Sequence, residues 1–203
     1  MKKLVIASNN PGKLREIAHI LEPLGIEIAP QSAYGVPEAE EPHCTFVENA
    51  LAKARHASRI AGLPALADDS GICAQALDGA PGVRSARYAE AAADRLTQDE
   101  SNNRKLLAAL RGAADRRAHY YCVIVLVRHA DDPQPLIAEA EWHGVVLEAP
   151  RGSGGFGYDP LFFLPDLGKS AAELAPEHKN RISHRGKALA LLAQKLKGVT
   201  RDA

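Results

Sequence analysis

Two long segments of strand-forming residues, separated by one tight turn, constrain the fold of this chain more than any other feature. Residues 120–128 are mostly apolar or aromatic, residues 136–147 are also rich in apolar residues, and the turn sequence Asp131-Asp132-Pro133 lies between them. This arrangement predicts an antiparallel pair of long strands. The chain has 203 residues, which is enough for one domain with a sizeable core.

The first half of the chain alternates short apolar runs with helical patterns. The helix at residues 45–61 opens with the capping box Thr45-Phe46-Val47-Glu48 and is closed by Gly62. Strands that alternate with helices, followed by a long hairpin, predict an α/β fold with a mixed sheet. The apolar spacing predicts strands at residues 4–7, 26–29, 64–67 and 85–88, helices at 14–24, 45–61, 97–110 and 184–196, and an exposed loop at 111–118.

The composition excludes several classes of protein. The 25 basic and 25 acidic residues give no net charge, so the overall charge favours neither nucleic acid nor an anionic membrane. No segment approaches the roughly 20 apolar residues that a membrane-spanning helix needs. Three scattered cysteines form no disulfide framework and no zinc motif, and they suit a reducing cytosol. We therefore expect a cytoplasmic protein that binds neither nucleic acid nor membranes.

Two adjacent carboxylates, Asp68 and Asp69, follow the predicted strand at residues 64–67. Charges beside a core strand are costly unless a cation, a metal or hydrogen bonds compensate them. In open α/β sheets, ligands also bind at the carboxyl ends of strands. We therefore interpret residues 68–71 as a turn that leaves the strand and carries chemistry. The alternative is an Asx-turn that only ends the strand.

A second candidate segment leaves the first strand and opens a helix. Its sequence is Ser8-Asn9-Asn10-Pro11-Gly12-Lys13. Backbone N–H groups at the helix start and the Lys13 cation suit a phosphate group, although the spacing of a P-loop is absent. An ordinary strand-to-helix turn is the alternative. On the next predicted helix, Lys53 lies one turn beyond Asn49, and the alternative there is a surface lysine.

Two further segments, near the C-terminus, combine residues that suit a nucleotide. Phe156 lies between glycines of the segment 152–157, where it is placed to stack on a nucleobase unless it enters the core. Asp159 is placed to accept hydrogen bonds or hold a cation. Residues 178–187 hold four cations and two histidines, which indicates a polyanion site or, alternatively, a solvated basic face. The carboxylates that suit a hard ion such as Mg²⁺ are Glu38, Glu40, Glu41, Asp68 and Asp69.

Taken together and in this order, the motifs resemble those of the inosine triphosphate pyrophosphatase family (RdgB type). The resemblance covers nearly the whole chain. One departure is Pro42-His43-Cys44, which stands where the family commonly has Thr-Gly, so the choice between Glu40 and Glu41 stays open. The matching motifs are residues 8–13, 45–50 with 53–54, 67–71, 79–83, 85–88, 154–160, and 179 with 182–186.

The resemblance implies an activity and an architecture. Members of the family hydrolyse ITP, dITP and XTP to the monophosphate and pyrophosphate with Mg²⁺, and they are typically homodimers. The implied fold is an elongated mixed β-sheet flanked by helices, with residues 1–203 forming a single domain of two lobes and the nucleotide in the cleft between them.

The resemblance also implies a role for each matching residue. Asp69 becomes the proton acceptor and a metal ligand, with Glu40 or Glu41 as the other metal ligand. Phe156, Gly157, Tyr158 and Asp159 fall at the base, together with His184 and Arg185 at its 6-keto group. The implied contacts to the triphosphate and the rest of the substrate are Ser8, Asn9, Asn10, Pro11, Gly12, Lys13, Lys53, Ser70 and Lys179.

Two other interpretations of the sequence remain open. One is a different nucleotide pyrophosphatase, such as the Maf-like enzymes that share this architecture and act on pyrimidine or modified nucleotides. The other is a non-catalytic module that binds a nucleotide or RNA through residues 179–187. A non-catalytic binder would release no pyrophosphate in the presence of Mg²⁺.

Overall fold

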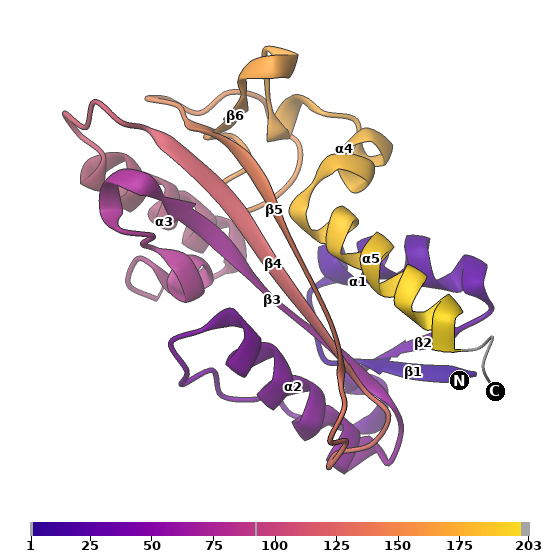
Figure 1. Ribbon diagram of the computed structural model, residues 1–203. Helices are drawn as coiled ribbons and strands as arrows, with labels where there is room; N and C mark the ends of the chain where they lie inside the picture. The colour runs from indigo at the N-terminus through magenta and orange to yellow at the C-terminus, as the bar shows by residue number, and fades with distance from the viewer. Residues whose placement is uncertain (1, 92, 200–203) are drawn as a thin grey trace. The chain divides into compact units, whose positions relative to one another are not determined.

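The computed structural model describes residues 2–91 and 93–199 and contains a seven-stranded mixed sheet flanked by helices (Figure 1). The strand order is β2-β1-β3-β4-β5-β6-β7. β1 pairs in parallel with β2 and β3, whereas β6 pairs antiparallel with β5 and β7. This sheet confirms the α/β prediction. The strands are β1 (Lys3–Ile6), β2 (Glu27–Pro30), β3 (Ala65–Ala74), β4 (Arg117–Val127), β5 (Leu136–Val146), β6 (Phe162–Leu164) and β7 (Lys169–Ser170).

The described residues divide into two compact units. Unit 1 lies within residues 1–69, 122–140 and 185–203, and unit 2 comprises residues 70–121 and 141–184. Unit 1 holds β1, β2 and the turn between β4 and β5, and unit 2 holds β6 and β7. The helices are α1 (Pro11–Leu21), α2 (Phe46–Ala61), α3 (Arg95–Ala109), α4 (Pro176–Ile182) and α5 (His184–Val199).

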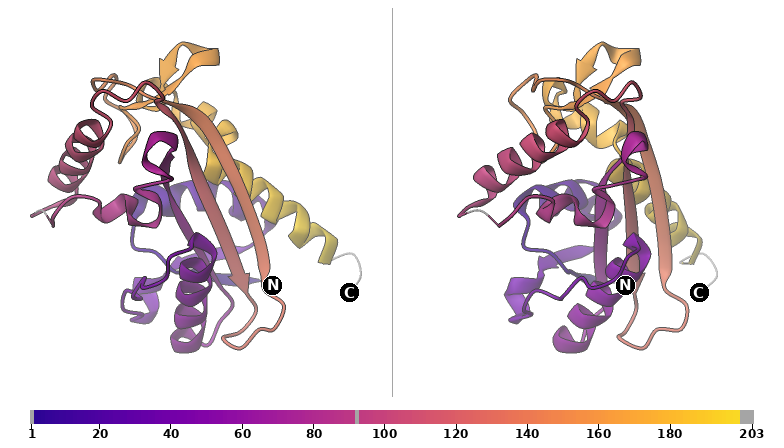
Figure 2. Two further views of the ribbon diagram at one scale, coloured as in Figure 1. Left: turned by 60° about the vertical axis from the view of Figure 1, so that its left-hand side comes forward. Right: turned by 90° about the vertical axis from the view of Figure 1, so that its left-hand side faces the viewer.

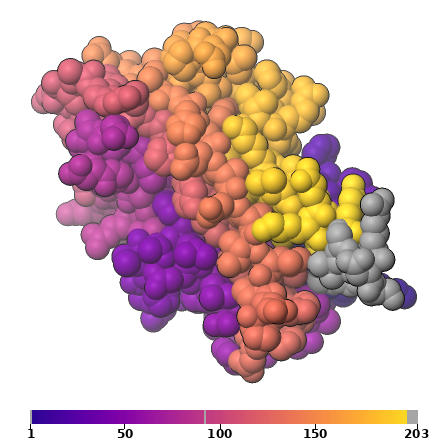
Figure 3. All heavy atoms as spheres, viewed as in Figure 1, coloured from indigo at the N-terminus to yellow at the C-terminus, as the bar shows by residue number. Residues whose placement is uncertain are grey.

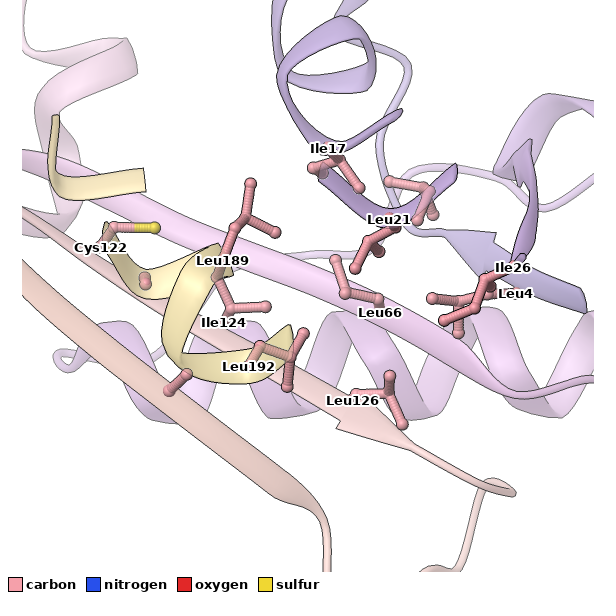
Figure 4. Close-up of a cluster of buried hydrophobic side chains, with 13 residues drawn as sticks. Leu4, Ile17, Leu21, Ile26, Leu66, Cys122, Ile124, Leu126, Leu189 and Leu192 are labelled. Atoms are coloured by element: carbon pink, nitrogen blue, oxygen red, sulfur yellow. The ribbon is translucent and has the colours of Figure 1, made fainter. Parts of the chain in front are cut away.

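The main core of unit 1 lies on one face of its strands, under α1 and α5 (Figure 4). Successive strand side chains point to opposite faces, so Leu4 and Ile6 reach this face while Val5 is buried on the other. The outer side of α5 lies on the molecular surface (Figure 3). The helices contribute Ile17, Leu21, Leu189 and Leu192, and β3 and β4 contribute Leu66, Cys122, Ile124 and Leu126.

Helix α2 covers the opposite face of the strands of unit 1 (Figure 1). Ala50, Ala54 and Ala57 recur at helical spacing and are fully buried, and their small side chains let the helix approach the sheet closely. The predicted caps are confirmed, because Thr45 accepts a hydrogen bond from the backbone N–H of Glu48 and Gly62 ends the helix at a φ of 65°.

Unit 2 is built around aromatic residues. Tyr120, Trp142 and Phe162 contact one another, with ring centroids 4.7 to 6.3 Å apart. Tyr158 is buried in the same cluster, and its hydroxyl donates a hydrogen bond to the carbonyl of Ser85. Leu106 of α3 also packs into this core. The aromatic cluster therefore holds the β-strands of unit 2 against α3.

The structure corrects the predicted turn at residues 68–71. β3 continues to Ala74, so Asp68 and Asp69 lie inside the strand. The strand continues because Ile72 and Ala74 are again buried and because cations compensate the carboxylates, as described below. Gly71 is required inside this strand, since a Cβ there would lie 2.3 Å from the carbonyl oxygen of Gly82.

Two smaller predictions are also wrong. Residues 85–88 were expected to form a strand, but Gly82–Arg87 is a 3₁₀ helix in which the Ser85 hydroxyl bonds to the Gly82 carbonyl three residues back. The expected loop at residues 111–118 ends early, because β4 begins at Arg117. Arg116 stabilises this junction by donating hydrogen bonds to the carbonyls of Leu110, Val146 and Leu147.

Candidate active site

The turn that opens α1 is organised by its own side chains. Asn10 caps the helix, since its Oδ1 accepts hydrogen bonds from the backbone N–H groups of Gly12 and Lys13 at 2.9 and 3.4 Å. The Ser8 hydroxyl oxygen accepts the N–H of Asn10 at 3.1 Å. Three of the amides that the sequence offered to a phosphate are therefore already hydrogen-bonded. The phosphate contact predicted for this segment would therefore depend mainly on Lys13.

Asp68 lies in a buried cluster of charges in unit 1. Its Oδ2 lies 3.0 Å from Lys13 Nζ and 3.1 to 3.2 Å from two nitrogens of the Arg185 guanidinium. Arg185 is only 3% exposed, and it also contacts Glu16 of α1 at 2.5 Å. Burial alone would raise the pKa of Asp68, but Lys13 and Arg185 outweigh burial and hold this pKa well below its usual range. Asp68 is therefore a charged partner of two cations at neutral pH.

Asp69 has a different environment, because adjacent residues of a strand point to opposite faces. Its Oδ1 lies 3.1 Å from Lys53 Nζ, and the same Nζ lies 2.7 Å from Glu41 Oε1. Burial and the Glu41 charge raise the pKa of Asp69 above its usual value, although Lys53 opposes them. A carboxylate with a raised pKa accepts a proton more readily than an ordinary aspartate. The structure thus separates the two aspartates chemically.

Asn49, which was not predicted as a site residue, connects this group to the loop before α2. Its side chain is fully buried, pairs with both the N–H and the C=O of His43, and donates a hydrogen bond to Asp69 Oδ2 at 3.3 Å. The available signal was an asparagine on the buried face of an alanine-rich helix, one turn before Lys53. Asn49 therefore fixes the segment that carries Glu41 next to Asp69.

The structure also distinguishes the two glutamates that the sequence left as alternatives. Glu41 is half-buried and contacts Lys53, whereas Glu40 is exposed. Within residues 2–91 and 93–199, no group of three or more histidine, cysteine or acidic side chains is arranged to hold a metal ion. Two carboxylates that already converge on one cation fit Mg²⁺, which takes one or two protein carboxylates and completes its shell with water and phosphate oxygens.

The glycine-rich segment of unit 2 is held by Asp159. This buried carboxylate accepts the backbone N–H of Phe156 at 2.9 Å and lies 2.5 Å from Lys179 Nζ. Lys179 also lies over the Phe156 ring, 4.6 Å from its centroid. A Cβ at Gly155 would lie 2.1 Å from Asp159 Oδ2, so glycine is needed there. Phe156 is half-buried and packs beside a cation, so its ring does not enter the core.

His184 and Arg185 are neighbours in sequence, but they belong to different units. His184 stacks on Tyr120 in unit 2, with ring centroids 4.6 Å apart, and Arg185 joins the charge cluster of unit 1. Together with Lys179, both side chains are buried. A solvated basic face is therefore the wrong interpretation for these three residues. Ser70, the remaining predicted contact beside Asp69, is half-buried on β3.

Comparisons with known proteins agree on one family. A model of the Ham1 family matches residues 4–195. A dITP/XTP pyrophosphatase of Ralstonia nicotianae is 66% identical over 97% of this chain and 98% of its own length, and one of Nitrosomonas europaea is 67% identical over 97% and 95%. The structure of a HAM1 protein from Coxiella burnetii superimposes with a TM-score of 0.90 at 48% identity, covering 98% of this chain and all of the other. Among the described residues, none of the helices is long and apolar enough to cross a membrane.

Proposed function

The chain belongs to the Ham1 family, and we propose that it is a nucleoside-triphosphate pyrophosphatase that hydrolyses ITP, dITP and XTP to the monophosphate and pyrophosphate. The names of the relatives that are 66% and 67% identical over nearly the whole chain support these substrates. The observation that carries the reaction is the Lys53 ammonium group shared by Asp69 and Glu41. Together, Lys53, Asp69 and Glu41 supply a cation, a proton acceptor and two oxygen ligands in one place.

The chemistry of pyrophosphate release explains why these residue types are needed. Water must lose a proton as it attacks the α-phosphorus, and negative charge grows on the departing pyrophosphate. Asp69 takes the proton, and the raised pKa suits this role. Lys53 and Lys13 neutralise charge on the phosphates, and Asp68 keeps Lys13 oriented at 3.0 Å.

Mg²⁺ is the divalent ion that we propose for this site, with Asp69 and Glu41 as its protein ligands. When bound, the ion would neutralise phosphate charge. Glu40 is not assigned to the metal, because its side chain is exposed.

Recognition of the base is proposed from the chemistry of its 6-position. Inosine and xanthine carry a keto oxygen there, which accepts hydrogen bonds from donors of the protein. Adenine carries an amino group, so a protein donor would face another donor. His184 and Arg185 were predicted as those donors, and Phe156 as the stacking residue. In unit 2, His184 and Phe156 stay assigned to the base. Arg185 contacts Asp68 and Glu16 in unit 1. We therefore propose two roles for it, which are to compensate these carboxylates and to favour the 6-keto group.

We also propose that the active protein is a cytoplasmic homodimer. The resemblance to the family supports the dimer, and the three free cysteines suit a reducing compartment. Analytical ultracentrifugation at micromolar concentration would measure the mass directly, and a species of one chain mass, 21.7 kDa, would contradict the dimer.

Removal of divalent metal should stop pyrophosphate release from ITP. Chelation with EDTA is expected to lower the rate by at least about 100-fold, since a metal ion contributes several kcal/mol of charge stabilisation in such reactions. Added Mg²⁺ should restore the rate, while the melting temperature should change little because Lys53 already compensates both carboxylates. An unchanged rate in EDTA would contradict the proposed metal site.

A further inference from the structure

One face of α3 holds the loop that carries Phe156. Arg95, Asp99 and Asn103 are four residues apart, so they line one side of the helix. All three contact residues 156 and 157 of the same unit. Both views of Figure 2 show α3 beside the loop that follows β5.

The contacts fix both ends of one residue. Asp99 Oδ2 accepts the N–H of Gly157 at 2.8 Å, and the Asn103 Nδ2 donates to the carbonyl of Gly157 at 2.9 Å. Asp159 accepts the preceding N–H, that of Phe156. Three side chains therefore set the direction of three successive peptide groups, and the backbone cannot turn without losing hydrogen bonds, two of which involve a carboxylate.

The ring of Phe156 is also held by this face. The guanidinium carbon of Arg95 lies 5.6 Å from the ring centroid, and Lys179 Nζ lies 4.6 Å from it. Arg95 is exposed, so it can move aside or stack on a bound base without disturbing the core. Phe156 is thus held through its backbone neighbour by Asp99 and Asn103, and its ring is faced by an exposed cation.

Stability alone does not account for Asn103. Among the described residues, its Oδ1 is buried without a hydrogen-bond partner, which costs free energy and offsets much of what the Gly157 contact contributes. The core contacts of α3 come from other residues, such as Leu106. Asn103 thus keeps an unpaired oxygen for the sake of one contact to the Gly157 carbonyl. This cost indicates that the direction of the loop backbone is important for function.

We propose that Arg95, Asp99 and Asn103 position Phe156 for the purine base and so determine how tightly the base is held. The proposal rests on the proposed function, because it assumes that a purine nucleoside triphosphate is the substrate. It concerns KM for the nucleotide, and it predicts little effect on binding of the phosphates.

The test compares Asp99→Ala and Asn103→Ala with two reference variants. Asp99→Asn keeps an oxygen that can accept the Gly157 N–H, and Glu100→Ala removes an adjacent exposed carboxylate with no role in the loop. For each purified full-length variant, kcat and KM for ITP, the inhibition constant of inorganic tripolyphosphate and the melting temperature are measured. Tripolyphosphate probes the phosphate contacts without a base.

Asp99→Ala is expected to raise KM for ITP about 10-fold, since a hydrogen bond to a charged group is lost, with kcat and the tripolyphosphate constant within about two-fold. Asn103→Ala should raise KM about three- to ten-fold without lowering the melting temperature. Asp99→Asn and Glu100→Ala should stay within about three-fold of wild type.

A folded Asp99→Ala or Asn103→Ala enzyme with wild-type KM would overturn the inference, as would a parallel rise in KM and in the tripolyphosphate constant. These outcomes differ from failure of the proposed function. In that case the wild-type protein itself would release no pyrophosphate from ITP, and the inference would fall with it.

Discussion

Replacing Asp69 with asparagine is expected to lower kcat for ITP by at least about 1,000-fold, because the proposed general-base role contributes about 10² to 10⁴ and the proposed metal ligand is weakened at the same time. Asparagine has nearly the same shape, and Lys53 keeps its contact with Glu41, so the fold should persist. Pyrophosphate release under saturating ITP measures kcat, and circular dichroism with thermal melting checks the fold.

Asp131→Asn is the matched control, because it removes the charge of an aspartate whose side chain is 89% exposed in the turn of unit 1. It should keep kcat within about two-fold, as surface substitutions away from a site usually do. Equilibrium binding of a non-hydrolysable ITP analogue should change far less in Asp69→Asn than turnover does. Turnover near the wild-type value in Asp69→Asn would remove Asp69 from the proposed role.

Replacing Arg185 with methionine should destabilise the protein by about 3–5 kcal/mol, because removing one partner leaves uncompensated buried charge. Asp68 and Glu16 both lose their contact with the guanidinium, while the contact between Asp68 and Lys13 remains. Urea unfolding monitored by tryptophan fluorescence and circular dichroism gives the free energy of unfolding. A loss below about 1 kcal/mol would show that the cluster contributes little.

The same cluster predicts a direction of pH dependence. The pKa of Asp68 is depressed in the folded protein, so its contribution to stability is fully present above the unfolded pKa, about 3.9, and is lost as the pH falls toward the folded pKa. Arg185→Met removes one cause of that depression. Between pH 5 and pH 3, which lie about one unit on either side of the unfolded pKa, the free energy of unfolding should therefore fall less in the variant than in wild type.

Local signals predicted most of the elements of the fold. The capping box at Thr45 and the glycine at position 62 marked both ends of α2, and runs of apolar and strand-forming residues identified β1, β4 and β5. The length of β3 was missed, because two aspartates followed by serine and glycine are typical of a turn. The place of Asp68 inside a strand depends on Arg185, which lies 117 positions further along the chain, and that of Asp69 depends on Lys53.

Site residues that belong to a sequence motif were predicted. Site residues whose role depends on tertiary contacts were missed. Lys53 and Asp69 came from motifs, and the structure places them 3.1 Å apart. Asn49 was missed although an asparagine on the buried face of an alanine-rich helix was a signal, and Glu16 was missed because a helical glutamate carries no signal until its partner is known. The choice of Glu41 over Glu40 likewise required the position of Lys53, because both glutamates lie in one polar loop.

The most direct test of the account is the product formed from different nucleotides in the presence of Mg²⁺. ITP, dITP and XTP should each give the monophosphate and pyrophosphate, with kcat/KM for ITP at least about 100-fold above that for ATP, because a site built on donors to a 6-keto oxygen rejects an amino group there. UTP and dTTP should be poor substrates. Equal rates with ITP and ATP, preferred hydrolysis of UTP or dTTP, or release of orthophosphate in place of pyrophosphate would contradict the account.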